Sequence, residues 1–257
     1  MLNNKIKISV VSYLNSKPFI LALKKAQLTD VLEISLDIPS DCAAKLLDNR
    51  VDIGLVPVTI IPKLPRAKII GNHCIAADGE VGSVLLLSDV PLHEIQKIYL
   101  DNESRTSVEL VRILSEKFWK INPDWLSAKP GYEKYIKGHI AGVIIGDRAL
   151  KEKKKFPYAF DLAEEWKKLT GLPFVFACWV ANKEIDPDIR EKLTRALSTV
   201  SDFIPDVIES HNEDGISKDE VELYFKKNIQ YDLDEKKMEG MKLFLQFLEE
   251  EHKPAGK

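Results

Sequence analysis

The 257-residue sequence predicts an α/β protein with two lobes. Short β-rich runs alternate with amphipathic segments that have helical spacing, which is typical of α/β folds with mostly parallel sheets. These elements fall into two series that separate near Leu87, and the long apolar run at residues 172–181 could return the chain to the first series. We therefore expect a discontinuous first lobe, residues 1–87 plus 177–257, and an inserted second lobe, residues 88–176.

The first series begins with a strand at residues 6–11 and a helix at 18–27, where Pro18 stands near the first helical turn. Proline costs little at that position because its missing N–H would have no helical partner. The run Val84 to Leu87 does not alternate in polarity, which fits a strand covered on both faces. The remaining elements expected before residue 88 are strands at 32–36, 51–58, 68–75 and 81–87 and a helix at 39–49.

The second series starts with a strand at residues 97–100 and an amphipathic helix at 106–119, for which Thr106 and Glu109 have capping-box spacing. Another strand is expected at 141–145. Asp161 should cap the following helix, and Gly171 should end it. The elements expected after this helix are a strand at 172–181 and helices from Asp186 to about 204, at 218–227 and at 234–251.

Composition limits the function classes. Hydrophobic residues make up 45% and charged residues 30% of the chain, an ordinary balance for a globular protein. With 37 basic against 40 acidic residues the net charge is −3, which argues against a non-specific nucleic-acid binder. No run reaches the roughly 18 apolar residues of a membrane span, and no secretory signal is visible. We expect a cytoplasmic protein without a membrane partner, and the sequence does not predict an oligomeric state.

Sequence motifs for common cofactors and metals are missing. The chain contains no Gly-x-Gly-x-x-Gly, no P-loop, no His-Glu-x-x-His and no Gly-x-Ser-x-Gly. The five histidines lack metal-ligand spacing, and Cys42, Cys74 and Cys178 are too widely spaced for a zinc site or a disulfide framework. Each of these absences argues against a cofactor or metal enzyme, and none excludes one.

Polar residues follow the first strand in the segment SYLNSKPF, residues 12–19. A turn that opens a helix directs backbone N–H groups and short polar side chains towards a ligand. Ser12 is a candidate binding residue, and Asn15 can both donate and accept hydrogen bonds. The alternative is that Asn15 or Ser16 is only the N-cap of the helix.

A second polar turn, DNESRTS at residues 101–107, also ends a strand and opens a helix. Ser104, Arg105, Thr106 and Ser107 at a helix N-terminus make a candidate carboxylate site. A capped helix with a solvated Arg105 would explain the same residues.

Two glycine-containing turns complete the candidate set. Gly82 would let a ligand approach the backbone beside the Ser83 hydroxyl, although a plain glycine turn fits as well. Gly146 and Asp147 follow the strand at 141–145. Asp147 could orient a substrate hydroxyl or could cap the helix that starts at Arg148.

Five segments in this order resemble the MqnA-type chorismate dehydratases of the futalosine route to menaquinone. The segments are SYLNSKPF (12–19), DIGLVPV (52–58), SRTSV (104–108), IGDRAL (145–150) and DLAEEWKKLTGLPFVFA (161–177). The resemblance implies a two-lobed fold like that of the type II periplasmic binding proteins, with an interlobe cleft. It also implies that chorismate loses water to give 3-[(1-carboxyvinyl)oxy]benzoate without a cofactor or metal.

By this resemblance, the family's cleft asparagine corresponds to Asn15 and its cleft serine corresponds to Ser83, which makes the two residues the candidate catalytic pair. No Asp–His or Lys–Glu pair stands out as a general base. The base could be a carboxylate of the substrate itself, held at the correct angle by the protein, or Asp147, which could also accept a substrate hydroxyl.

Two other functions share this fold. One is a cytoplasmic binding protein for an aromatic or cyclic carboxylate, because fold alone does not separate an enzyme from a binding protein. The other is the related 1,4-dihydroxy-6-naphthoate synthase, which uses a cleft histidine. His139 would have to serve as that base here, and no second feature of the sequence supports it.

Overall fold

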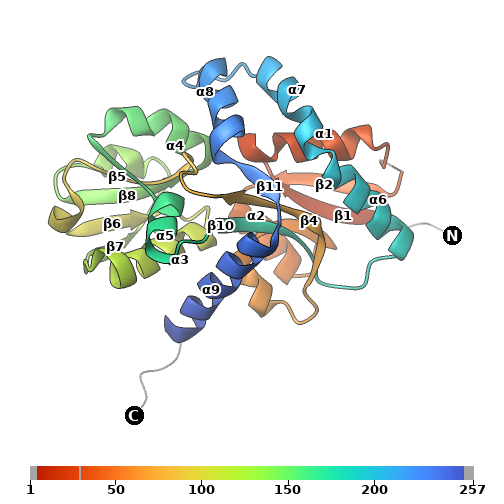
Figure 1. Ribbon diagram of the computed structural model, residues 1–257, viewed down its shortest axis with the longest axis horizontal. Coiled ribbons are helices and arrows are strands. Elements are labelled where there is room, and N and C mark those ends of the chain that lie inside the picture. The colour runs from red at the N-terminus through yellow and green to blue at the C-terminus, as the bar shows by residue number, and fades with distance from the viewer. Residues whose placement is uncertain (1–4, 29, 252–257) are drawn as a thin grey trace, which may run out of the picture. The chain divides into compact units, whose positions relative to one another are not determined.

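Two β-sheets organise the chain, one in each of two units, in a computed structural model that describes residues 5–28 and 30–251 (Figure 1). Unit 1 consists of Met1–Ala76 and Phe176–Asp234, and unit 2 of Ala77–Val175 and Glu235–Lys257. The chain therefore passes between the units three times. In the described part of the chain, no helix combines the length and the apolar character needed to cross a bilayer.

The sheet of unit 1 has the strand order β11-β4-β10-β3-β1-β2. Strand β1 runs parallel to β2 and β3, whereas β10 is antiparallel to β3 and β11 is antiparallel to β4. The strands are β1 (Ile6–Val11), β2 (Leu32–Asp37), β3 (Ile53–Pro57), β4 (Lys68–Ala77), β10 (Phe174–Ala181) and β11 (Gln230–Asp232). All eight residues of β10 are buried, which explains its continuous apolar sequence.

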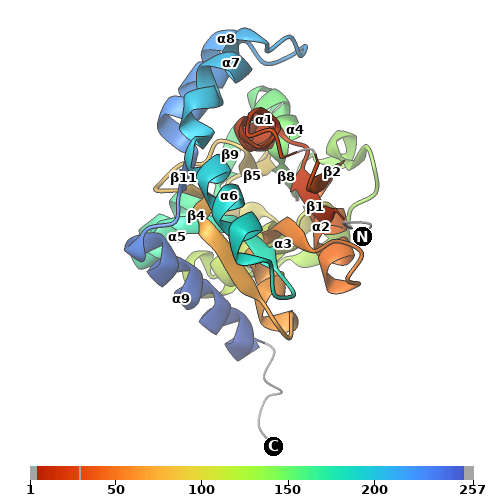
Figure 2. The same cartoon turned by 90° about the vertical axis from the view of Figure 1, so that its right-hand side faces the viewer.

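Helices of unit 1 come from both of its chain segments. Helix α1 packs against α6 and η7, while α7 lies beside α8 (Figure 2). Phe19 of α1 anchors this unit, since its ring meets Trp179 and Tyr231 edge-on at 5.4 and 5.0 Å. The helices are η1 (Leu14–Ser16), α1 (Lys17–Lys25), α2 (Pro39–Leu47), η2 (Val58–Lys63), α6 (Pro187–Ser198), η7 (Val200–Phe203), α7 (Ile204–Glu209), α8 (Lys218–Leu223) and the π-helical turn η8 (Tyr224–Asn228).

The sheet of unit 2 has the strand order β7-β6-β8-β5-β9. Strand β6 is parallel to β7 and β8, and β5 is antiparallel to β8 and β9. The strands are β5 (Val84–Ser88), β6 (Lys97–Leu100), β7 (Asp124–Ser127), β8 (Ile140–Ile145) and β9 (Tyr158–Asp161). The helices are η3 (Leu92–Glu94), α3 (Arg105–Ile113), the π-helical segment η4 (Leu114–Trp119), η5 (Tyr132–Tyr135), α4 (Gly146–Glu152), η6 (Lys153–Lys155), α5 (Leu162–Thr170) and α9 (Glu235–Glu251).

Helix α9, the long C-terminal helix in Figure 1, completes the core of unit 2. Its fully buried Phe244 contacts Trp166 of α5 and Phe174 of β10, with ring centroids 6.0 and 5.0 Å apart. Gly240 lies against the carbonyl oxygen of Pro173. The aromatic contacts bury large apolar surfaces, so they hold α9 on this unit.

The expected lobe boundaries, 1–87 plus 177–257 and 88–176, differ from this division by more than one residue at two places. Residues 77–87 belong to unit 2, because β5 pairs with β8 and β9. Residues 235–251 also belong to unit 2, because α9 packs on its aromatic core. Both sheets are mixed rather than mostly parallel, since β5 and β10 run against their neighbours.

Most local predictions are confirmed, with one cap corrected. Asp161 caps α5, Gly171 ends it in the left-handed conformation, and Asp186 caps α6. The cap of α3, however, is Ser104 rather than Thr106, because the Ser104 side chain accepts the N–H of Ser107. The sequence did not predict three short strands, which are β7, β9 and β11.

Candidate functional site at the carboxyl edge of the unit 2 sheet

Four loops of unit 2 meet at one edge of its sheet. Strands β6 and β8 are parallel and end at this edge, and β9 ends there too, because it pairs with the start of β5. In the register of these strands, Val84 lies opposite Ile145, and Leu85 lies opposite Asp161. The candidates that follow β6 and β8 or precede β5 are therefore gathered at one edge, the usual location of ligands in α/β sheets.

The N-terminus of α3 provides hydroxyl groups at this edge. Ser104 Oγ accepts the N–H of Ser107 at 3.1 Å and lies 2.8 Å from Ser107 Oγ. Thr106 and Ser107 are buried, whereas Arg105 is exposed. Capping thus accounts for Ser104 and Ser107. The alternative interpretation of this turn was a capped helix with a solvated Arg105, and both of these features are present. The start of a nine-residue helix nevertheless favours a negatively charged ligand.

The Gly82–Ser83 turn is fixed by a buried carboxylate. Asp161 accepts hydrogen bonds from the N–H groups of Gly82 at 2.6 Å, Ala163 at 3.0 Å and Glu164 at 3.1 Å. Burial raises the pKa of Asp161 to about 6, although the backbone donors favour its charged form. Gly82 has a φ of +71°, which glycine adopts without strain. Ser83 is 1% exposed, so the turn holds it in a fixed position.

Ser83 is also tied to the loop that opens α4. The Ser83 carbonyl accepts the N–H of Gly146 at 2.8 Å, and Gly146 has a φ of +63°. Helix α4 begins at Gly146 with Ile145 in the N-cap position, so Asp147 does not cap it. Asp147 lies in the first turn and is half-buried. The structure therefore brings Ser83, Gly146 and Asp147 together.

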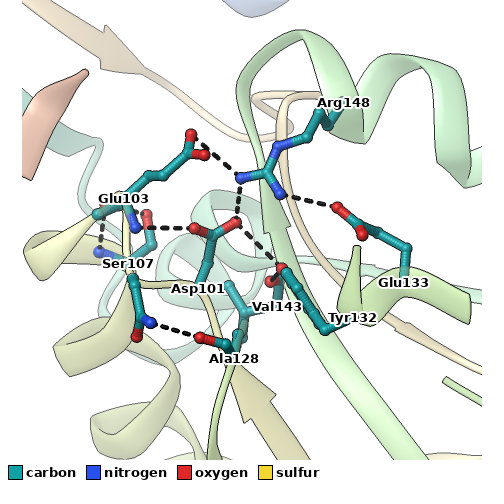
Figure 3. A network of polar contacts seen from close by, with 10 residues as sticks. Asp101, Glu103, Ser107, Ala128, Tyr132, Glu133, Val143 and Arg148 are labelled. Carbon is teal, nitrogen blue, oxygen red and sulfur yellow. Dashed lines mark hydrogen bonds and ion pairs between the residues drawn. The ribbon is translucent and has the colours of Figure 1, made fainter. Parts of the chain in front are cut away.

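A charged network lies beside α3 (Figure 3). The Arg148 guanidinium contacts three carboxylates: Asp101 at 2.6 Å, Glu133 at 2.7 Å and Glu103 at 3.2 Å. Asp101 also accepts the N–H of Glu103 at 2.9 Å and the hydroxyl of Tyr132 at 3.0 Å. The pKa of Asp101 is raised because burial outweighs the opposing effect of Arg148.

None of these network residues was predicted as a site residue from the sequence. Asp101 and Glu103 lie in the DNESRTS turn and Arg148 in the IGDRAL segment, whereas Tyr132 and Glu133 lie in no recognised motif. The adjacent opposite charges of Asp147 and Arg148 are a weak local signal for such a network.

Unit 1 holds the two remaining candidates. The backbone N–H of Ser12 donates to the carbonyl of Asp37, and the residue is exposed. The Asn15 side-chain amide donates to the Tyr224 hydroxyl at 3.3 Å, and its side-chain oxygen accepts the Ser16 hydroxyl at 3.1 Å. The backbone carbonyl of Asn15 accepts the Tyr231 hydroxyl at 2.7 Å. The N-cap of α1 is Ser16, which makes no capping bond with its side chain. Asn15 is therefore held by two tyrosines rather than used as a helix cap.

His139 lies at the opposite end of β8 from Gly146. It is exposed, and its Nδ1 lies 2.9 Å from the carbonyl of Glu94. This position gives no support to a histidine base near Ser83. Within residues 5–28 and 30–251, no group of three or more His, Cys, Asp or Glu side chains is arranged to hold a metal ion.

Comparisons with solved structures show the fold. Protein AF1704 from Archaeoglobus fulgidus aligns with a TM-score of 0.75 at 12% sequence identity. The alignment covers 98% of this chain and 99% of the AF1704 chain. The alkanesulfonate-binding protein SsuA from Xanthomonas axonopodis pv. citri aligns with a TM-score of 0.62 at 14% sequence identity, over 96% of this chain and 92% of the SsuA chain. A Candida albicans protein with the generic periplasmic binding protein fold has a TM-score of 0.62 at 12% identity, with coverage of 99% and 92%. The chain thus has the expected periplasmic-binding-protein-like fold.

Sequence comparisons show the family. A chorismate dehydratase from Thermus thermophilus is 28% identical over 174 residues, which are 58% of this chain and 61% of that relative. The match thus spans about three fifths of the relative's length. The family model described as menaquinone biosynthesis matches residues 6–250. The chain therefore belongs to the menaquinone biosynthesis family of proteins.

Proposed function

We propose that the protein is a chorismate dehydratase, a hydro-lyase that removes water from chorismate to give 3-[(1-carboxyvinyl)oxy]benzoate. The observation that carries this proposal is the family match over residues 6–250, together with the chorismate dehydratase from Thermus thermophilus. As the resemblance implies, the reaction belongs to the futalosine route and needs no cofactor or metal. We further propose that it takes place in the cytoplasm.

The chemistry asks little of the protein beyond positioning. Chorismate carries two carboxylates and an allylic hydroxyl, and the loss of water makes its ring aromatic. The enzyme must hold both carboxylates, assist removal of the ring proton and help the hydroxyl group leave. Correct placement of reacting groups can supply about 7–11 kcal/mol of the barrier.

The N-terminus of α3 is suited to one substrate carboxylate. Its backbone dipole favours a negative charge, and the hydroxyls of Ser104, Thr106 and Ser107 lie in its first turn. Arg105, which is exposed, can approach the same anion. Ser12, Gly146 and Asp147 complete the proposed binding set.

Asn15 and Ser83 are the proposed catalytic residues. The contacts of the Asn15 side chain with the hydroxyls of Tyr224 and Ser16 fix the orientation of its amide, which can then donate to the leaving hydroxyl or to the enolpyruvyl carboxylate. Ser83 is immobilised by the bonds of Gly82 and Gly146 and performs the complementary task. The base is a carboxylate of the substrate itself, with Asp147 as the second candidate.

The test is to mix purified protein with chorismate, without metal or cofactor, and to follow the product by liquid chromatography and mass spectrometry. We expect a product lighter by one water molecule over many turnovers. Unchanged chorismate with a clear heat of binding would instead support a binding protein for cyclic carboxylates.

Variants then test the assigned roles. Asn15→Ala should lower kcat by about 100-fold or more, the usual cost of losing one donor to a developing charge. Asn122→Ala is the matched control, because Asn122 is an exposed residue outside the site. Near-normal turnover by Asn15→Ala would show that the role assigned to Asn15 is wrong.

A further inference from the structure

Arg148 contacts more carboxylates than its single charge can match. Three carboxylates lie within 3.2 Å of its guanidinium nitrogens. The carboxylates come from different places: Asp101 follows β6, Glu103 immediately precedes the N-cap of α3, and Glu133 lies on η5. Each of the three carboxylates forms an ion pair with the Arg148 guanidinium.

This excess charge lies next to the group proposed to bind an anion. Asp101 accepts the N–H of Glu103, and Glu103 is bonded directly to Ser104, the cap of α3. Without Arg148, carboxylates at this turn would repel a substrate carboxylate and offset the attraction of the helix N-terminus.

We propose that Arg148 is a positioning residue which keeps the N-terminus of α3 able to bind an anionic substrate by neutralising Asp101 and Glu103. This inference rests on the proposed function. The guanidinium fork is suited to the task, because Nη2 contacts Asp101 and Glu103 while Nη1 contacts Glu133. Arg148 thereby fixes the loop before α3 relative to α4 and η5.

The effect should appear in substrate binding rather than in the chemical step. Arg148→Gln should raise KM for chorismate about tenfold, as expected for unscreened like charges near a binding site, while kcat stays within about threefold. Arg148→Lys keeps the positive charge but loses the fork, so it should restore most of the KM. A purely structural role for Arg148 would not be rescued in this way.

The pH profile supplies an independent readout. The titratable groups that face Arg148 are Asp101, Glu103, Tyr132 and Glu133. Burial already raises the pKa of Asp101, and removal of Arg148 would raise that pKa further. As the pH falls, Asp101 takes up a proton and the repulsion decreases. The KM of Arg148→Gln should therefore approach the wild-type KM in acid, and added salt should also reduce the difference.

A second variant covers the case in which Arg148→Gln does not fold. Glu103→Gln removes one carboxylate from a partly exposed position, and it should lower KM about threefold. Glu116→Gln makes the same charge change twelve residues beyond Ser104, at the far end of the α3–η4 segment, and should leave KM unchanged.

The outcomes separate this inference from the proposed function. If the wild type does not convert chorismate, both are overturned. If the wild type converts chorismate but Arg148→Gln or Glu103→Gln has the wild-type KM across the pH range, only the role of Arg148 is overturned. A KM shift that Arg148→Lys and low pH both reverse supports the inference.

Discussion

Replacing Gly240 with alanine tests how α9 is attached to unit 2. Gly240 lies within this helix, where glycine is about 1 kcal/mol less favourable than alanine. On helix propensity alone, Gly240→Ala should stabilise the protein. A Cβ at this position, however, would lie 2.2 Å from the carbonyl oxygen of Pro173. Contacts of this kind are essentially never shorter than 3.0 Å, so α9 would have to move away by about 0.8 Å.

That movement has a cost that can be estimated. Overpacking a well-packed contact costs about 1–3 kcal/mol, and the upper end applies here because the obstacle is backbone rather than a flexible side chain. The gain in helix propensity returns about 1 kcal/mol. The net loss is about 2 kcal/mol, which corresponds to a fall in Tm of about 4–8 °C for a domain of this size. Displacement of α9 would also loosen the contacts of Phe244 with Trp166.

Differential scanning calorimetry measures the change in Tm, and hydrogen exchange across residues 235–251 shows whether α9 has loosened. Glu239→Ala is the matched control, because Glu239 is an exposed neighbour on the same helix. Its Tm should remain close to that of the wild type. A rise in Tm for Gly240→Ala, with unchanged exchange in α9, would refute the packing of this helix against Pro173.

Two further predictions concern titratable groups. The pKa of Asp161 is about 6 in the folded chain against an ordinary value of 3.8 for this group, so between these values the folded chain binds a proton that the unfolded chain lacks. This group's contribution to the free energy of unfolding should therefore increase by about 1 kcal/mol from pH 7 to pH 5, and Asp161→Asn should abolish that increase in urea titrations at the two pH values. Cys42, Cys74 and Cys178 are buried free thiols, and burial raises the pKa of Cys42 and Cys178 to about 12. Ellman's reagent should react with none of them in the folded chain and with all three in denaturant, and rapid reaction of the native protein would contradict their burial.

Local signals made much of the fold predictable from the sequence. Asp161, Gly171 and Asp186 lie at helix ends, where the type of residue reports directly on backbone hydrogen bonding. Short strands such as β7 and β11 have three or four residues, too few for periodicity to identify. Helix α9 was recognised as a helix but placed in the wrong unit, because an apolar stripe does not specify the surface that it covers.

The candidate site was predictable only in part for the same reason. Ser83 and Gly146 lie in recognisable turns, and the sheet register brings them together. The tyrosine partners of Asn15 follow it by 209 and 216 residues, in a region without a recognisable motif. No spacing rule connects residues so far apart. The network around Arg148 was missed because charged residues at separations of 15 to 47 positions resemble ordinary surface charges.

The late position of α9 in the chain affects how the protein is made. Unit 2 has its sheet once residue 175 has been synthesised, but the helix that covers Trp166 and Phe174 follows another 59 residues later. At translation rates of about 5–20 residues per second, this aromatic surface waits about 3–12 s for its partner. Unit 1 also waits for residues 176–234, which supply strands β10 and β11. Neither unit can finish folding on the ribosome before residues 176–251 have been made, so a chaperone that shields apolar surface would act during the synthesis of that segment.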